Sequence, residues 1–523
     1  MFRVIYARER VYEAIKTPYF DILLLFIWNI VYYTTLNLQC EEDNLNQCFV
    51  DLFELNIAQN LLRLILCENW KNGLDGEMLN LENECLIETP KICLMDTLNS
   101  FMDLSQSDCQ TPYISPQFSK YNTTKPFIGL YDTTKLTDKE DILGSLAPHA
   151  LNKVSGYESL EEALQNHESV IDVNQQTLHH KILRSESLVE QRQAIETTPV
   201  NQNLIIIYID ALSRARAHKK LPKTMQFFKD QINAEKDVYE FYKYSAFYGY
   251  TAENVEAIHY GFTMDNSDMQ MYYSYQSITQ YFKDKGFIVG RSQNYCERFY
   301  FPFTQHIIDR FSFEPADHEM ISFACDPHYH QEKFPDFAYI GPYSMFRKCL
   351  YGQDTFQYVL DFGEDFMKTY ENERKVLFLN FIDYHEGTGT AVRFLDEPLA
   401  RFLQEQESQN TSFILMSDHG FHMNGLLFQL GRIYGQSEIE KLMPLLILSN
   451  PGGIPEKYRK NMYYNEQKLL SHKQLHYFFK YWATGEIQNQ PSLISEMPDD
   501  LTNCQDIGYN CQCQNYYVTT FGL

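Results

Sequence analysis

Three largely apolar runs of the sequence each lead into an aspartate. The runs and their aspartates are 203–209 with Asp210, 376–382 with Asp383, and 413–417 with Asp418. A histidine follows two of these aspartates closely, namely His385 and His419. Carboxylate oxygens and imidazole nitrogens together suit a divalent ion, and geometry chooses among Zn, Mn, Mg and Ca. The sequence therefore predicts a divalent metal site and leaves the identity of the metal open.

Buried strands would have to place these aspartates together. Apolar runs of this length, bounded by turn signals, are typical of a strand covered on both faces, as in a parallel sheet. Ligands of an α/β sheet gather at the carboxyl ends of its strands, so the aspartates are expected at one edge if all three strands are parallel. The alternative is that Asp418 caps a turn and that His419 is an ordinary surface imidazole.

Helical and apolar stretches alternate through the second half of the chain. We expect helices at 274–285, 354–370 and 396–407, and further strands at 286–290 and 443–449. Alternation of this kind predicts an α/β fold with a mostly parallel sheet sandwiched by helices.

A threonine is the candidate nucleophile. Residues 242–250 are predicted to form an aromatic strand that ends in a turn, and 252–259 a helix with Thr251 at its N-cap. The N–H groups and the dipole at a helix start favour a developing anion on the Thr251 hydroxyl. A bound cation would lower the hydroxyl pKa and make the group a nucleophile. The alternative is that Thr251 is a plain helix cap.

The composition is that of a globular, acidic protein. Hydrophobic residues make up 44% of the 523 residues and aromatic residues 15%, which excludes a mainly disordered chain. The length allows roughly two to four domains. The formal charge of −25 at pH 7 argues against binding to nucleic acid or to an acidic membrane surface. An anionic substrate would therefore need local positive charge, such as a metal ion.

The amino terminus carries a membrane-targeting pattern. A basic segment, residues 1–21, precedes the apolar segment 22–38, and acidic residues follow it. This pattern predicts a cytosolic tail at 1–21 and an uncleaved signal anchor at 22–38, with a lumenal or extracellular remainder. The protein would then be a single-pass type II membrane protein. A cleaved signal peptide, which would give a secreted protein, is the alternative, although no small-residue cleavage site follows the apolar segment.

Cysteine usage agrees with an oxidising compartment. All 12 cysteines lie beyond the anchor, and their even number predicts a disulfide framework of unknown connectivity. Residues 39–200 are acidic, Cys-rich and irregular, so we expect a lumenal stem or accessory region there, and a Cys-containing tail at 486–523. Sequons at Asn122 and Asn410 predict a glycoprotein.

Several motifs, in their order along the chain, resemble those of one known superfamily. They are Asp210-Ala-Leu-Ser-Arg214, Gly249-Tyr-Thr251-Ala-Glu-Asn254, Asp383-Tyr-His385-Glu, Ser417-Asp-His-Gly420 and Glu440-Lys-Leu-Met-Pro444. The chain resembles the sulfatase-like branch of the alkaline phosphatase superfamily, and more narrowly a family of secreted or membrane-anchored eukaryotic proteins of unassigned function. The resemblance predicts an alkaline phosphatase-like catalytic domain at 201–485.

The resemblance also implies roles for individual residues. Thr251 and His385 would be catalytic, with His385 near the transferred group. Apart from the resemblance, we predict that Arg214, Asn254 and His385 bind substrate, with Arg214 paired to a nonbridging oxygen. A surface salt bridge is the alternative for Arg214. The implied metal ligands are Asp210, Thr251, Asp418 and His419.

Departures from the family patterns bear on the reaction. The segment 249–254 is one residue shorter than its counterparts and lacks their proline. No Cys or Ser stands in the Cys/Ser-x-Pro-x-Arg setting of formylglycine sulfatases, which argues against sulfate ester cleavage by that route. Gln474 stands where relatives often have aspartate, between His472 and His476.

These observations predict a metal-dependent phosphodiesterase or phosphotransferase that acts on a lumenal or extracellular phosphoester through Thr251. One alternative is a catalytically silent ectodomain that binds a glycan, a lipid head group or a protein. A further alternative is a sulfatase that uses Thr251 directly. Expected partners are the membrane, through the anchor, and a small phospho- or sulfo-ester, glycan or lipid head group, but no nucleic acid.

Overall fold

The computed structural model describes residues 123–132, 154–261, 276–295, 315–325, 349–386, 389, 391–408, 410–422 and 441–498. The chain divides into two compact units, and all described residues belong to the unit formed by 68–91 and 104–523. The predicted cytosolic tail, the signal anchor and residues 499–523 of the predicted tail lie outside these ranges. Within them no helix is long and apolar enough to cross a bilayer.

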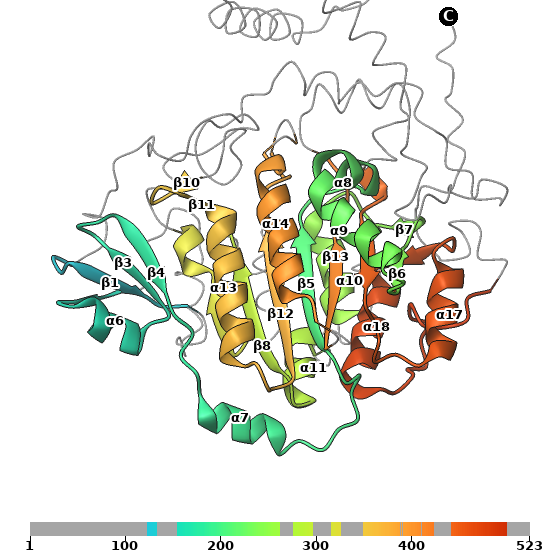
Figure 1. Cartoon of the computed structure of the whole chain (residues 1–523), viewed down its shortest axis with the longest axis horizontal. Coiled ribbons are helices and arrows are strands. Elements are labelled where there is room, and N and C mark those ends of the chain that lie inside the picture. The colour runs from blue at the N-terminus through green and yellow to red at the C-terminus, as the bar shows by residue number, and fades with distance from the viewer. Residues whose placement is uncertain are drawn as a thin grey trace, which may run out of the picture. The chain divides into compact units, whose positions relative to one another are not determined.

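A seven-stranded sheet forms the centre of this unit (Figure 1). From one edge to the other its strands are β6 (Val238–Glu240), β14 (Leu446–Ser449), β13 (Thr411–Met416), β5 (Asn203–Ile209), β12 (Lys375–Phe381), β8 (Ile288–Gln293) and β9 (His318–Met320). The strands from β13 to β9 are parallel, whereas β14 and β6 pair antiparallel. The predicted α/β fold with a mostly parallel sheet is confirmed.

The three strands that lead into aspartates lie side by side, with β5 between β13 and β12. Ile209, the last residue of β5, is in register with Phe381, the last residue of β12. The aspartates that follow these strands therefore emerge at the same edge of the sheet. Every residue of β5 is buried, and full burial of an Ile or Leu side chain stabilises the fold by roughly 1.5–3 kcal/mol, so this edge is firmly placed.

Helices cover both faces of the sheet (Figure 1). Helices α9 (Pro222–Asn233), α13 (Thr355–Thr369) and α14 (Arg393–Gln406) contact one another in series. Helices α10 (Thr251–Tyr260), α11 (Ile278–Asp284) and α18 (His472–Thr484) form a second group in mutual contact. Leu204 and Ile206 of β5 share one core with the second group. Because side chains alternate along a strand, β5 also presents residues to the opposite face.

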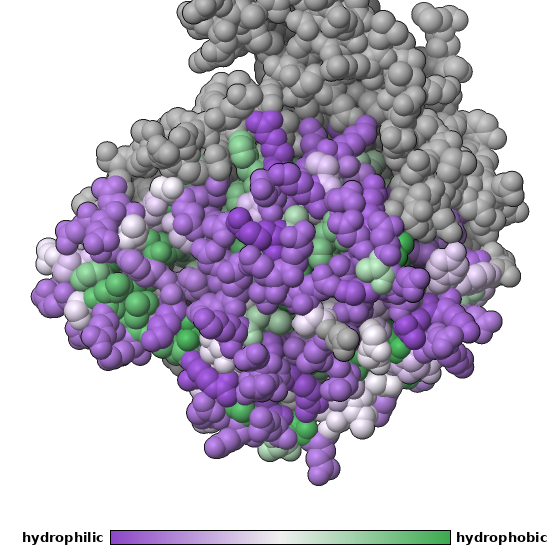
Figure 2. All heavy atoms as spheres, in the orientation of Figure 1, coloured by the Kyte–Doolittle hydropathy of each residue, from purple (hydrophilic) through white to green (hydrophobic). Residues whose placement is uncertain are grey.

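A four-stranded antiparallel sheet precedes the central sheet in the chain. It consists of β2 (Val154–Tyr157), β1 (Phe127–Leu130), β3 (Ser169–Asp172) and β4 (Thr177–His180), with α6 (Leu160–Asn166) packed against it. The predicted stem thus contains a regular sheet that its irregular sequence did not indicate. The face shown in Figure 2 is mostly hydrophilic, with hydrophobic side chains gathered at the left, over the small sheet.

Buried polar contacts join the small sheet to β9. Asp132 accepts hydrogen bonds from the backbone N–H groups of Ile321 and Ser322, both at 2.8 Å. Glu168 lies 2.6 Å from Nδ1 of His318 in a buried ion pair. The small sheet is therefore an integral part of the unit that carries the central sheet.

Shorter elements complete the described structure. They are α7 (Glu186–Gln193), α8 (Arg214–Lys220), β7 (Tyr244–Ser245), a 3-10 turn (Ser322–Cys325), β10 (Cys349–Leu350), β11 (Gln353–Asp354), α17 (Glu456–Asn465) and β15 (Leu470–Ser471). β7 pairs in parallel with β15, and β10 pairs with β11.

Two predicted elements differ from the structure. The predicted strand 242–250 is reduced to β7, because the chain after Ser245 forms a loop that leads into α10. The helix expected from residue 274 begins at Ile278, because the Ser277 hydroxyl caps it by accepting the N–H of Gln280 at 3.2 Å.

Candidate active site

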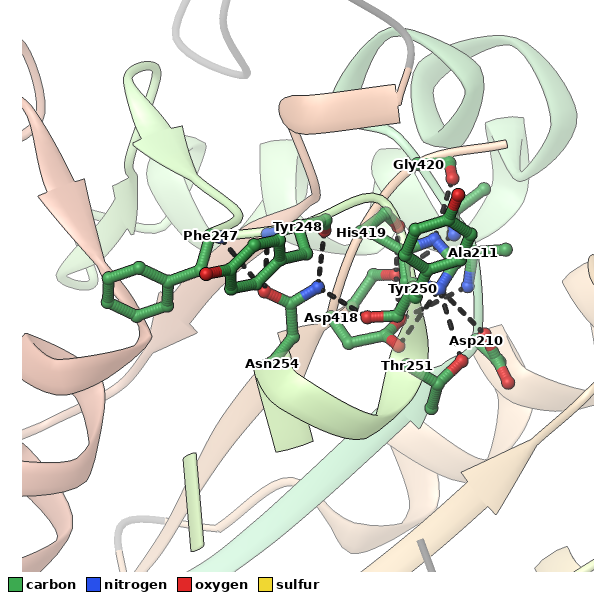
Figure 3. Close-up of polar contacts among 12 residues, drawn as sticks. Asp210, Ala211, Phe247, Tyr248, Tyr250, Thr251, Asn254, Asp418, His419 and Gly420 are labelled. Carbon is green, nitrogen blue, oxygen red and sulfur yellow. Dashed lines mark hydrogen bonds and ion pairs between the residues drawn. The ribbon is translucent and has the colours of Figure 1, made fainter. Parts of the chain in front are cut away.

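Asp210, Asp418 and His419 converge at the carboxyl edge of the sheet (Figure 3). All three are buried, and one ligand atom from each lies within 4.8 Å of those from the others. Nε2 of His419 is 3.2 Å from Oδ2 of Asp418 and 3.8 Å from Oδ1 of Asp210. Burial raises the pKa of Asp418, because a carboxylate is costly to bury without a compensating charge. The structure thus brings together three of the residues that the sequence predicted as metal ligands.

The turns after β5 and β13 bind each other. Ala211, which follows Asp210, has φ of 62°, a left-handed conformation that is unusual for a residue with a Cβ. Its N–H donates to Oδ1 of Asp418 at 3.3 Å. The hydroxyl of Ser417 accepts the N–H of Leu212 at 2.9 Å and donates to the carbonyl of His419 at 2.8 Å. These bonds hold the carboxylates at the two strand ends in fixed relation.

His419 is held in one tautomer. Nδ1 lies 2.7 Å from the carbonyl oxygen of Gly420, which only accepts, so Nδ1 carries the proton and donates it. Nε2 then presents its lone pair to Asp210 and Asp418. Burial, slightly opposed by the bond to Gly420, lowers the pKa of His419 to about 4, so the ring is neutral at pH 7. A neutral imidazole with its other nitrogen bonded to the backbone is the usual state of a metal ligand.

His472 supports the cluster from behind. Nε2 of His472 donates to the carbonyl oxygen of Asp418 at 2.6 Å, and Nδ1 accepts the hydroxyl of Tyr244. Burial lowers the pKa of His472 to about 4, which agrees with a neutral ring that donates at one nitrogen and accepts at the other. The sequence alone did not show whether His472 or His476 contributes to the metal site. His476 instead donates from Nδ1 to the carbonyl of Ile258, at 2.9 Å, in the packing of α18 against α10.

Thr251 lies beside the cluster. Its Oγ1 is 3.1 Å from Nε2 of His419, and only 7% of the residue is exposed. The predicted N-cap position is wrong by one residue: Tyr250 is the N-cap, without a side-chain cap bond, and Thr251 is the first residue of α10. The helix start still surrounds the hydroxyl with N–H groups that have no acceptor within the helix.

Asn254 shapes the loop that delivers Thr251. Its Oδ1 accepts the N–H groups of Phe247 and Tyr248, at 2.9 and 3.2 Å. Its Nδ2 donates to the carbonyls of Tyr248 and Tyr250, at 2.6 and 2.8 Å (Figure 3). The amide is fully buried and its bonds are all directed to the loop. Asn254 is therefore a positioning residue, and its burial gives no support to the predicted role in substrate binding.

The side chain of Arg214 is also bonded within the protein. Its guanidinium donates to Glu240 at 2.9 Å in an ion pair whose side chains are 3% and 2% exposed. Nε2 of His218 lies 2.7 Å from the same carboxylate oxygen. The salt-bridge alternative is thus the one that the structure shows, and the pair is buried rather than on the surface. Its placement gives no support to the predicted role of Arg214 in substrate binding.

The segment 441–445 forms backbone hydrogen bonds with several loops around the site. Its backbone carbonyls accept N–H groups from three different loops: Lys441 from Gly420 at 2.7 Å, Leu442 from Ala246 at 3.0 Å, and Met443 from Arg214 at 3.1 Å. The residues inside the predicted Glu-x-x-x-Pro motif thus lie against the loops of the site, although Glu440 itself is outside the described residues.

Of the two predicted residues that follow the neighbouring strand β12, His385 rather than Asp383 lies near the rings beside the metal cluster. Asp383 accepts a hydrogen bond from Nδ2 of Asn294 at 2.7 Å and is not part of the cluster. The His385 ring lies 5.0 Å, centroid to centroid, from the ring of His422. His422 in turn lies 4.6 Å from the ring of His419, so a row of three imidazoles leads away from the cluster.

His422 was not predicted from the sequence. Burial, together with the nearby charge of Lys441, lowers the pKa of His422 to about 2, and its Nδ1 is buried without a hydrogen-bond partner within the described residues. The only available signal was its spacing, three residues after His419 in Asp-His-Gly-Phe-His.

Residues 160–517 match the family described as "Protein of unknown function (DUF229)". The chain belongs to the DUF229 family. This membership confirms the predicted kinship with a family of unassigned function. No curated protein sequence matches the chain.

Solved structures that resemble this DUF229 chain include proteins of the predicted superfamily. The C-terminal periplasmic domain of EptC from Escherichia coli, in complex with Zn, has 10% identity over 58% of this chain and 88% of that chain, with a TM-score of 0.40. The lipoteichoic acid synthase LtaP from Listeria monocytogenes has 10% identity, coverages of 60% and 81%, and a TM-score of 0.36. A protein in the alkaline phosphatase superfamily from Vibrio parahaemolyticus has 13% identity, coverages of 60% and 70%, and a TM-score of 0.33.

Proposed function

We propose that this protein is a metal-dependent phosphodiesterase or phosphotransferase in which Thr251 attacks a phosphoester. The observation that carries the proposal is the position of the Thr251 hydroxyl, 3.1 Å from Nε2 of His419, beside the buried carboxylates of Asp210 and Asp418. A hydroxyl next to buried carboxylates and a neutral imidazole is the arrangement in which a cation would both offset the buried charge and activate the oxygen.

The side chains present fit a divalent cation. Oδ2 of Asp418 is buried and accepts no hydrogen bond within the described part of the chain, and it faces the lone pair of His419 Nε2. Asp210, Asp418, His419 and Thr251 offer oxygen and nitrogen donors that suit Zn, Mn, Mg or Ca. A bound cation would lower the hydroxyl pKa and stabilise negative charge on the ester oxygens.

The chain's own residues account for the remaining steps. The Thr251 hydroxyl releases its proton to solvent and its oxygen attacks phosphorus. The new P–O bond forms as the ester bond breaks, and the departing alkoxide takes a proton from solvent and leaves as the alcohol. Water or an acceptor alcohol then attacks the phosphorylated Thr251 and restores the hydroxyl. We take His385 and His422, whose rings adjoin each other and that of His419, as the groups that contact the transferred group, and Lys441 adds positive charge near His422.

Turnover of chromogenic esters by the full chain tests this proposal. The substrates are aryl phosphomonoester, phosphodiester and sulfate, each with Mn, Zn, Mg, Ca or chelator, for the wild type, Thr251→Val and Asp418→Asn. Metal-dependent diester cleavage that both variants lose supports the proposal. Cleavage of the sulfate ester alone would indicate a sulfatase. A folded protein that cleaves none of them with any metal would be a catalytically silent ectodomain.

We also propose that the site faces the lumen or the cell exterior, on a protein anchored at 22–38. Cys325 and Cys349 are disulfide-bonded, which supports an oxidising compartment. Asn410 of the second sequon is exposed, as a glycosylated asparagine must be. Protease protection of the carboxyl-terminal part in sealed microsomes, and a mobility shift with a glycosidase, are expected. Complete digestion without detergent would contradict this orientation.

A further inference from the structure

An exposed aromatic ring stands immediately before the candidate nucleophile. Tyr250 is 56% exposed, whereas Thr251, the next residue, is 7% exposed. The backbone of Tyr250 is held in place, because its carbonyl accepts the Nδ2 of Asn254 at 2.8 Å. The ring therefore has a fixed base beside Thr251 (Figure 3), and more than half of the residue is open to solvent.

Lys441 is laid along this ring. Its ammonium lies 4.9 Å from the centroid of the Tyr250 ring. Its aliphatic stem passes over Gly249 so closely that a Cβ at that position would come within 1.5 Å of Cε of Lys441. A side chain at position 249 would displace the Lys441 stem, so the Gly-Tyr-Thr sequence lets a cation, an aromatic ring and a hydroxyl lie next to one another.

His422 connects the ring to the metal cluster. Its ring is 6.0 Å from that of Tyr250 in an edge contact and 4.6 Å from that of His419. We name Tyr250, Lys441 and His422 the rim subsite. A molecule whose phosphorus lies at Thr251 would extend along this subsite, since Tyr250 immediately precedes Thr251 and the His422 ring contacts that of His419.

We propose that the rim subsite binds the organic group of the phosphoester and selects a neutral or anionic ring, such as an aryl or sugar ring, over a cationic head group. The inference rests on the proposed function, because it takes the phosphoryl group to lie at Thr251. An open tyrosine face stacks on a flat ring. The ammonium of Lys441 already occupies the place at the ring where a second cation would bind, and it repels one.

The negative charge of the whole chain increases the effect of Lys441 on which ligands bind at the rim subsite. The formal net charge is −25, so most of the surface attracts cations rather than repelling them. A lysine held beside the ring by its own stem reverses this preference locally. Selection at the rim subsite would therefore follow Lys441 and not the average field of the protein.

Binding of three small phosphate esters to the full-length, metal-loaded protein tests the inference by calorimetry. The probes are phenyl phosphate, with a neutral ring, propyl phosphate, neutral without a ring, and phosphocholine, cationic without a ring. The wild type is expected to bind them in that order of decreasing affinity. Tyr250→Ala should weaken binding of phenyl phosphate about three- to tenfold and leave propyl phosphate unchanged. Lys441→Glu should raise the affinity for phosphocholine relative to propyl phosphate.

Tyr464→Ala is the matched control. Tyr464 is 45% exposed and Lys468 lies 4.4 Å from its ring centroid, so the same kind of pair is removed away from the site. This variant should keep all three affinities. A wild type that prefers phosphocholine, or binds none of the probes, would overturn the inference, as would an unchanged ratio of phenyl to propyl phosphate in a folded Tyr250→Ala. A failed catalytic proposal would appear as absent turnover in the ester assay, whereas a failed rim subsite would appear as an unchanged ratio of phenyl to propyl phosphate binding in Tyr250→Ala.

Discussion

The hydroxyl oxygen of Thr251 lies 3.1 Å from Nε2 of His419, although 168 residues separate them in the chain. β13 delivers His419 and the start of α10 delivers Thr251, and the tautomer of His419 directs the Nε2 lone pair at the hydroxyl. The pair is therefore the point at which the proposed metal and nucleophile meet.

Replacement of the Thr251 hydroxyl is expected to abolish activity and leave the fold intact. Thr251→Val keeps the shape of the side chain but has no nucleophile, so the diester cleavage rate should fall by about a thousandfold or more. Thr251→Ser retains a hydroxyl and should keep measurable activity. Initial rates with saturating metal provide the comparison. Equal activity of Thr251→Val and wild type would remove Thr251 from the mechanism.

Removal of one carboxylate charge is expected to abolish metal-dependent stabilisation. Metal at a hundred times its dissociation constant should stabilise the wild type by about 2.7 kcal/mol. Asp418→Asn should lose most of this gain, seen as a missing rise in the thermal midpoint. Asp383→Asn is the matched control, because Asp383 follows the adjacent strand but contacts Asn294 and is outside the cluster. A loss in both variants would mean that the metal lies elsewhere.

Loss of the Asn254 amide is expected to loosen the loop before Thr251. Asn254→Ala would leave buried backbone groups of the loop without partners and should lower the unfolding free energy by about 2–4 kcal/mol. Activity should fall with it, through displacement of Thr251. Asn166→Ala removes an exposed amide that bonds to one carbonyl, and it should change the free energy by less than about 0.5 kcal/mol. Denaturant unfolding gives the stability of each variant, and initial rates give its activity. A stable but inactive Asn254→Ala would instead support direct substrate contact.

The bond behind the metal cluster is expected to tune metal affinity. His472→Ala removes the donor to the Asp418 carbonyl, and loss of such an outer contact should weaken metal binding about 10- to 100-fold. His476→Ala, one turn further along α18, removes a comparable buried bond away from the cluster and should leave metal affinity unchanged. Competition with a chromogenic chelator gives the affinities. Equal losses in the two variants would point to a general effect on α18.

The buried Glu240 is expected to make stability depend on pH in the acid range. Burial alone would raise its pKa, but the charges of His218 and Arg214 outweigh burial and lower the pKa from 4.5 to about 2. A lowered pKa in the folded state stabilises the protein fully above pH 4.5 and less as the pH falls towards 2. The full contribution is about 3 kcal/mol.

The comparison with Glu240→Gln isolates this effect from that of the other carboxylates. The difference in unfolding free energy between wild type and variant should shrink as the pH falls between about 4.5 and 3. Urea unfolding at each pH measures it. A difference that does not change with pH would show that the charge of Glu240 does not contribute.

The sequence was sufficient for the parts of the fold that repeat a simple pattern. The apolar runs of β5, β12 and β13 allow only buried strands, and α13 follows a clear helical period, so the sheet edge and its aspartates were predictable. His419 and Thr251 followed from their places at a strand end and a helix start.

Residues whose partners are distant in the chain were not predictable. Arg214 meets Glu240 only because β6 lies at the edge of the sheet, and no local pattern reports this. Asn254 was taken for a substrate ligand because the sequence cannot show that a loop folds back onto its amide. The helix start moved by one residue for the same reason, since the bond from Asn254 to the Tyr250 carbonyl leaves Tyr250 at the N-cap.

The most direct test of the central claim is a crystal structure of the protein grown with zinc or manganese, with anomalous scattering recorded at the metal edge. We expect an anomalous peak coordinated by Asp210, Asp418, His419 and the Thr251 hydroxyl. A peak elsewhere in the chain, or none here while Thr251 still bonds to His419, would contradict it.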